Sequence, residues 1–148
     1  MTDALTPEQR SRNMSNIRGK DSRPERTVRS MLHRLGYRFR LHRKDLPGKP
    51  DLVFPSRRKV IFVHGCFWHM HECHKGKSTP STNAAFWEAK RRGTAERDIR
   101  TLDALDANGW KAFVVWECAL KDPEGLRNQL EAFLAQGPQW RNTVRQRN

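Results

Sequence analysis

The feature of this sequence that most constrains its fold is an unbroken apolar run, Val60-Ile61-Phe62-Val63. A strand without polar alternation has to be buried on both faces, and such strands lie in the centre of sheets that carry helices on each side. The apolar segments 52–54 and 112–116 predict further strands, and 37–41 alternates apolar with basic residues, as a half-exposed strand does. The sequence therefore predicts an α/β fold.

Three helices are expected around this sheet. Ser22-Arg23-Pro24-Glu25 forms a capping box ahead of an apolar stripe with helical spacing, which Gly36 ends. Helical patterning returns from 83 to 108, with a kink expected at Gly93, and Asp122-Pro123-Glu124 starts the last helix. A marginal helix is also expected within 1–20, starting at Thr6-Pro7 and running toward Gly19. The order helix, helix, three strands, loop, helix, strand, helix predicts a mixed central sheet.

The length of 148 residues allows one compact domain, which we place at 21–137. Residues 1–20 carry few apolar side chains and predict an arm that orders on a partner, and 138–148 predicts a flexible polar tail. No apolar run reaches the ~20 residues of a membrane span, and no signal segment opens the chain. We therefore expect a cytoplasmic protein with no membrane contact.

The chain carries 29 Lys and Arg against 16 Asp and Glu, a net charge of +13. An excess of this size favours a polyanionic partner, nucleic acid first, through release of counterions. A small, well-solvated basic protein is the alternative. Charge alone does not separate binding from catalysis.

Cysteine and histidine gather in the loop 64–81, where Cys66, His71 and Cys73 have the spacing C-x4-H-x-C. Three cysteines are too few for a disulfide framework, whereas these residues with Cys118 form a Cys3His set typical of closed structural zinc. His69 and His74 are competing ligands, and free thiols with a buried Cys118 are the alternative.

Asp51 follows the turn 46–50 and precedes a strand, so it should lie beside the end of the apolar strand 60–63. A carboxylate there suits Mg²⁺, which binds phosphate oxygens and the attacking water in nucleases. The second strand has no acidic residue or lysine, so proton transfer falls to His64 and His69, with Glu25 as a second carboxylate. Alternatively, Asp51 only follows a turn, Glu25 only caps a helix and the histidines are metal ligands or surface groups.

Two aromatic pairs, Phe67-Trp68 and Phe86-Trp87, stand in polar, basic surroundings near Lys90. Such rings suit stacking on bases or wedging between base pairs. Packing into the core is the alternative.

These motifs, taken in order, resemble the very short patch repair (Vsr) endonucleases over nearly the whole chain. The segments that carry the resemblance are Met14–Glu25, Leu46–Asp51, Phe62–His69, His71-x-Cys73, Asn83-x-x-Phe86-Trp87-x-x-Lys90, Arg97-Asp98 and Val115–Cys118. The resemblance implies a restriction-endonuclease-like core with a zinc-stabilised loop. It also implies Mg²⁺-dependent nicking of double-stranded DNA 5′ of the thymine in a T:G mismatch left by deamination of 5-methylcytosine.

Further expectations come from the resemblance alone. The enzyme would act as a monomer in the bacterial cytoplasm, near the nucleoid, with repair partners of the MutL and MutS type. The arm 1–20 would contact DNA through Met14. It would approach from the groove opposite the aromatic wedge formed by Phe67, Trp68 and Trp87. Thr94 stands where the family often has asparagine, and Met70 and Glu72 replace histidines found in some members.

The resemblance also implies roles at the site. Asp51 and the Val63 backbone carbonyl would hold Mg²⁺, and His69 would be the general base, assisted by His64 and Glu25. Structural zinc would be held by Cys66, His71, Cys73 and Cys118. DNA would be contacted by Met14, Phe67, Trp68, Trp87, Lys90 and Thr94. Two other functions stay open: a zinc-stabilised DNA-binding module without catalysis, and a related nuclease with another target, which Thr94 keeps in consideration.

Overall fold

The computed structural model describes residues 22–78 and 80–136. The predicted arm 1–20 with Met14, and the predicted tail 138–148, lie outside the described residues. None of the described helices has the length and apolar character that a membrane span requires.

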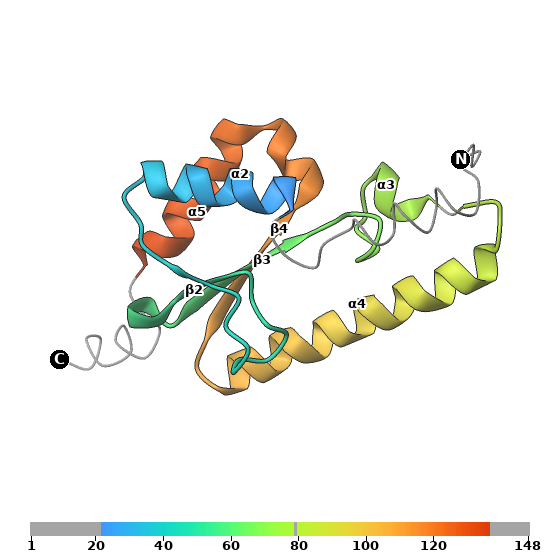
Figure 1. Cartoon of the computed structure of the whole chain (residues 1–148), viewed down its shortest axis with the longest axis horizontal. Coiled ribbons are helices and arrows are strands. Elements are labelled where there is room, and N and C mark those ends of the chain that lie inside the picture. Colours follow the sequence, from blue (N-terminus) through green and yellow to red (C-terminus); the bar gives the residue numbers. More distant parts are fainter. Residues whose placement is uncertain (1–21, 79, 137–148) are drawn as a thin grey trace.

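Four strands form one mixed sheet: β1 (Arg40–Leu41), β2 (Leu52–Phe54), β3 (Lys59–His64) and β4 (Lys111–Trp116). Their order is β1-β2-β3-β4: β2 pairs antiparallel with both β1 and β3, and β3 pairs parallel with β4. Figure 1 labels β2, β3 and β4. The central position predicted for the 60–63 run is confirmed, because β3 pairs on both sides and Val60, Ile61 and Phe62 are buried.

Helices cover both faces of this sheet (Figure 1). Helices α2 (Arg23–Arg34) and α5 (Pro123–Ala135) lie side by side on one face, and α4 (Ala84–Ala107) lies on the other. Ser22 Oγ accepts from the Glu25 N–H and Asp122 Oδ1 from the Gly125 N–H, so both predicted N-caps are confirmed. Shorter helical turns are η1 (Pro55–Arg57), α3 (His74–Lys77) and η2 (Glu117–Lys121).

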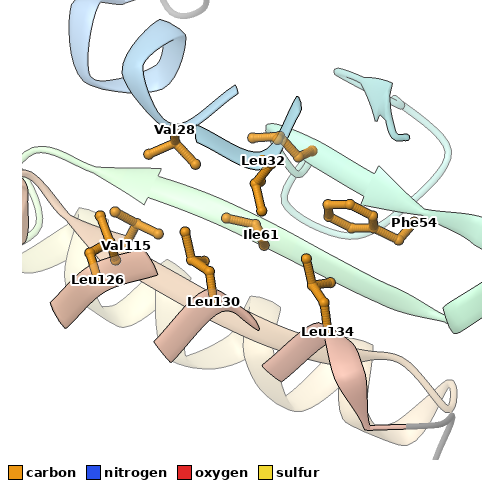
Figure 2. Close-up of a cluster of buried hydrophobic side chains, with 9 residues drawn as sticks. Val28, Leu32, Phe54, Ile61, Val115, Leu126, Leu130 and Leu134 are labelled. Carbon is orange, nitrogen blue, oxygen red and sulfur yellow. The ribbon is translucent and has the colours of Figure 1, made fainter. Parts of the chain in front are cut away.

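The larger core lies between the sheet and the α2 and α5 pair (Figure 2). Leucines one turn apart on α5 (126, 130 and 134) meet Val28 and Leu32 of α2 over Ile61 of β3. On the opposite face, Val60 and Phe62 pack with Leu105 and Trp110 under α4. Successive side chains of β3 therefore enter opposite cores, which is why this strand has no polar face.

Two predicted elements differ in extent. The strand expected over 37–41 is the two-residue β1, and Leu41 is 41% exposed. Tyr37 and Phe39 instead pack edge-on against Phe54, at ring distances of 6.5 and 5.9 Å, so aromatic packing replaces strand pairing there. Helix α4 runs through Gly93 as a single element of 24 residues.

Candidate functional site

Asp51 lies where the start of β2 meets the end of β3. The register pairs Leu52 with Ile61, so antiparallel pairing places Asp51 opposite the last residues of β3. The Val63 N–H donates a hydrogen bond of 2.7 Å to Asp51 Oδ2. The predicted proximity of Asp51 to the end of the apolar strand is therefore confirmed.

Burial raises the pKa of Asp51 to about 7; the bond from the Val63 N–H opposes the shift, and the Glu25 carboxyl adds to it. The fold thus holds a carboxyl where its charge is poorly solvated. A cation in the adjoining space would favour the ionised form, so the surroundings of Asp51 fit a metal ligand.

Glu25 reaches the same place from the first turn of α2 and is 3% exposed. It pairs with Arg29 one turn along the helix, and His42 Nε2 lies 3.0 Å from its Oε2. The backbone of His42 is left-handed (φ 52°), and its backbone N–H donates to the Asp51 backbone carbonyl at 3.3 Å. Sequence reasoning missed Arg29 and His42, because neither stands in a motif that points to the site.

His64 and His69 stack in parallel, with ring centroids 3.7 Å apart and 2° between the planes. His69 Nδ1 lies 2.6 Å from Asp98 Oδ2, on α4. Because a carboxylate only accepts hydrogen bonds, Nδ1 is the donor in this contact, and Nε2 is the nitrogen that carries the lone pair whenever the ring is neutral. An imidazole with one free nitrogen and a carboxylate that fixes its orientation is an arrangement that suits a general base. The only sequence signal for Asp98 was the Arg97-Asp98 motif.

His64, at the end of β3, is 7% exposed. Burial, reinforced by neighbouring His69, lowers the pKa of His64 to about 3, so its ring is neutral at physiological pH. Its Nδ1 has no hydrogen-bond partner within the described ranges. A buried, neutral, unpaired ring nitrogen is costly to keep, which suits a site that a ligand completes.

These groups surround a cavity of about 310 Å³, lined by Gly48, Lys49, Asp51, Phe62, Val63, His64, His69, Asp98, Thr101 and Leu102. The turn 46–50 packs closely on α4: Gly48 has φ +75°, and a Cβ there would lie 2.2 Å from Thr101 Cγ2. Glycine is therefore required where the turn closes one wall of the cavity.

A second cluster joins the loop to the end of β4. Ligand atoms of Cys66, His71, Cys73 and Cys118 all lie within 4.8 Å of one another. Tetrahedral zinc with ligand bonds of about 2.0–2.3 Å needs ligand atoms roughly 3.5 Å apart, so this Cys3His set fits zinc with modest closure. Of the histidines left open by the sequence, His69 is turned to Asp98 and His74 is exposed at the start of α3.

The environment of the cluster supports ligation. His71 stacks on Trp116 with ring centroids 4.2 Å apart, which orients its imidazole toward Cys118. Hydrogen bonding from the Gly76 backbone lowers the pKa of Cys73 to about 6, and burial raises that of Cys66 to about 12. A bound cation would hold both as thiolates.

The aromatic pairs form one cluster of Phe67, Trp68, Phe86 and Trp87, here called the aromatic cluster. Trp87 lies edge-on to the other three, with centroids 5.3–6.4 Å apart. Phe86 is 58% exposed, and Lys90 Nζ lies 5.9 Å from the centroids of Trp68 and Phe86. The cluster thus forms outside both hydrophobic cores, contrary to the core alternative.

Thr94 lies one turn after Lys90 on α4. Its hydroxyl donates to the Lys90 carbonyl at 3.2 Å and accepts from the Arg97 guanidinium at 3.2 Å.

The family model described as DNA mismatch endonuclease Vsr matches residues 2–75. A type II nicking enzyme, V.XorIIP of Xanthomonas oryzae pv. oryzae, is 53% identical over 90% of this chain and 98% of its own. The DNA mismatch endonuclease Vsr of Escherichia coli is 41% identical over 87% of this chain and 82% of its own.

A solved structure is similar in fold: the catalytic domain of homing endonuclease I-Bth0305I, with a TM-score of 0.54 and 18% identity over 76% of this chain and 94% of that domain. The predicted restriction-endonuclease-like α/β core with its mixed sheet is confirmed. Together with the identities to the nicking enzymes, these findings show that the chain is a DNA endonuclease of the Vsr family.

Proposed function

We propose that the protein nicks double-stranded DNA on the 5′ side of the thymine in a T:G mismatch, the product of 5-methylcytosine deamination, in a Mg²⁺-dependent reaction. The observation that carries the proposal is the cavity that Asp51 shares with the His69–Asp98 pair. A carboxylate for a metal and an oriented imidazole for a proton are the two groups that phosphodiester hydrolysis requires.

Asp51 and the Val63 backbone carbonyl are the groups that would hold Mg²⁺. The oxygen donors and the raised pKa of Asp51 fit this ion. When bound, Mg²⁺ would neutralise charge on the scissile phosphate and acidify the attacking water. Lys49 lines the cavity and would be available to the phosphate. Lys59, the first residue of β3, instead donates to the carbonyls of Phe133 and Gln136.

His69 would take the proton from water through Nε2, since Nδ1 is held by Asp98. The Asp98 carboxylate would stabilise the imidazolium that forms, as an acceptor fixed at 2.6 Å. His64 keeps the His69 ring in one plane by stacking and, being neutral, does not oppose its protonation. Glu25, anchored by Arg29 and His42, completes the acidic side of the site.

Mismatch selection would fall to Phe67, Trp68 and Trp87, inserted where the base stack is weakest. A mismatched pair costs less to unstack than a Watson–Crick pair, so a wedge enters it preferentially. Lys90 would contact phosphate beside the wedge, and Thr94 would face the bases. Structural zinc, held by the Cys3His cluster, would fix the loop that carries both the wedge and His69.

The proposal extends to residues and partners outside the described part of the chain. The arm 1–20 would close on the DNA through Met14. A single asymmetric nick requires one active site, so a monomer suffices. MutL- and MutS-type repair proteins would act with it at the bacterial nucleoid.

The test compares a labelled duplex carrying one T:G mismatch with its T:A control, in Mg²⁺. Mismatch-dependent nicking by the parent protein supports the proposal, and its absence removes it. Asp51→Ala should keep DNA affinity and lose nicking; unchanged behaviour would favour the non-catalytic binding module. Duplexes with other mismatches address the related-nuclease alternative, which Thr94 motivates, since its hydroxyl is already engaged by the Lys90 carbonyl and Arg97.

A further inference from the structure

Arg91 is a buried cation that the reaction described above does not use. It lies on α4 with 1% of its surface exposed. No carboxylate within 22–78 or 80–136 pairs with it. A guanidinium buried without a counter-ion is expensive, so its position requires strong compensation.

Three backbone carbonyls supply that compensation. Arg91 Nε donates to the Phe67 carbonyl at 2.6 Å, Nη1 donates to that of Ser78 at 2.7 Å, and Nη2 donates to that of Gly76. The guanidinium also lies 4.2 Å from the centroid of the Phe67 ring. Only the planar fork of arginine reaches three acceptors in this arrangement, and the ammonium of lysine does not reproduce it.

The bonded carbonyls stand near both ends of the loop 64–81, which carries the Cys/His cluster. Gly76 lies against the middle of the loop, where a Cβ would come within 1.7 Å of the His71 carbonyl. Arg91 therefore joins the loop to α4 near its start and near its end, in addition to the cross-link that a metal in the Cys3His cluster would provide.

Helix α4 contacts three consecutive loop residues from one stripe. Trp87 meets Trp68 at 5.5 Å, Arg91 binds the Phe67 carbonyl, and Asp98 binds His69. Positions 87, 91 and 98 are spaced by four and seven residues, which places them on one face of a helix. The contacts of Trp87 and Arg91 are made with residues of the aromatic cluster, and the contact of Asp98 is made with His69, the proposed general base.

We propose that Arg91 is a positioning residue that keeps the aromatic wedge in register with the His69 base. The inference rests on the proposed function. With Arg91 in place, insertion of Phe67 and Trp68 into the DNA fixes the backbone that leads into His69. Without the fork, the rings still insert but His69 is no longer held over the scissile phosphate.

The test uses Arg91→Lys in the full-length, zinc-loaded protein, with Arg100→Lys, an exposed arginine on the same helix, as the control. Zinc content, DNA affinity and the single-turnover nicking rate are measured on the T:G duplex, with 2-aminopurine beside the mismatch to report unstacking. We expect affinity within about threefold of the parent and a full unstacking signal. Nicking should slow on the order of 10- to 100-fold, because small misplacement of a reacting group has that effect.

Nicking by Arg91→Lys within twofold of the parent would overturn the inference. So would loss of affinity, unstacking and rate together, since that is the result of a merely structural role. If Arg91→Lys does not fold, Arg91→Gln, which keeps an NH2 donor, is measured in the same way. Loss of zinc or of the fold in both variants also assigns Arg91 a structural role only. Failure of the proposed function is distinct, because the parent itself would then show no mismatch-dependent nicking.

Discussion

Replacing Asp51 by asparagine is expected to stabilise the magnesium-free protein while abolishing strand cleavage. The fold raises the pKa of Asp51 from 3.8 to about 7, chiefly by burial. Because the folded-state pKa lies above that of the unfolded chain, the carboxyl contributes fully to the free energy of unfolding below about pH 4. This contribution is lost as the pH rises from about 4 through 7. Asparagine stays neutral throughout, and its amide oxygen can still accept from the Val63 N–H.

The magnitude follows from the shift. About three pKa units at 1.36 kcal/mol each give on the order of 4 kcal/mol at pH 8 as an upper figure. For a chain of this length, that corresponds to a rise in Tm of roughly 8–16 °C in Asp51→Asn. Near pH 4 both proteins are neutral at this position, and their Tm values should converge.

Thermal unfolding is measured by circular dichroism from pH 4 to 9 in buffers depleted of divalent cations, without a chelator that would also remove zinc. Adding Mg²⁺ should then stabilise the parent and leave Asp51→Asn unchanged. Asp103→Asn, an exposed position on α4, is the matched control. If Asp51→Asn is as stable as the parent or less stable at pH 8, the claim that burial destabilises the charged form of Asp51 is refuted.

Three further predictions concern the remaining parts of the site. Asp98→Asn should slow single-turnover nicking about 10- to 150-fold at unchanged DNA affinity, because a charge-assisted hydrogen bond to His69 worth roughly 1.5–3 kcal/mol is lost. An unchanged nicking rate would contradict the assignment of His69 as the general base. Cys118→Ser should lower bound zinc, measured by atomic absorption, from about one per chain, and lower Tm with it, since metal binding is coupled to folding; a fully folded parent with little zinc would exclude the metal site. Trp68→Ala should weaken binding to the T:G duplex by about 10- to 100-fold in a fluorescence titration, because one stacking contact with a base is lost. Binding to matched DNA, where phosphate contacts dominate, should change little, and an equal loss on both duplexes would exclude the ring from mismatch selection.

The backbone frame of the site was predictable because local patterns report burial. The run 60–63 indicated a central strand, and the turn before Asp51 indicated where the carboxyl would lie. Both followed from periodicity and from the reversal of the chain between two adjacent strands. The pairing of Asp51 with Val63 needed no knowledge of distant contacts, since 12 residues separate them.

The partners that orient the site were not predictable in this way. Asp98 meets His69 across 29 residues, and the contact depends on the length of α4 and on how the loop folds back onto it. His42 reaches Glu25 only because its backbone is left-handed at the end of β1. The choice of His71 over His69 and His74 as a cluster member depends on stacking with Trp116, which is a tertiary contact.

The length of α4 explains how one small domain joins the α/β core to the aromatic cluster. Its 24 residues span about 36 Å, whereas the six-residue strands β3 and β4 span about 20 Å. The C-terminal half covers the sheet through Leu102 and Leu105, and the N-terminal half extends past it beside the loop 64–81 (Figure 1). The N-terminal half of α4 has no strand beneath it. Its aromatic side chains, Phe86 and Trp87, therefore pack in the aromatic cluster, and its one buried residue is Arg91. A helix long enough to leave the core therefore carries Asp98, which binds His69, and Trp87, which packs on Trp68, about three turns apart on one rigid element.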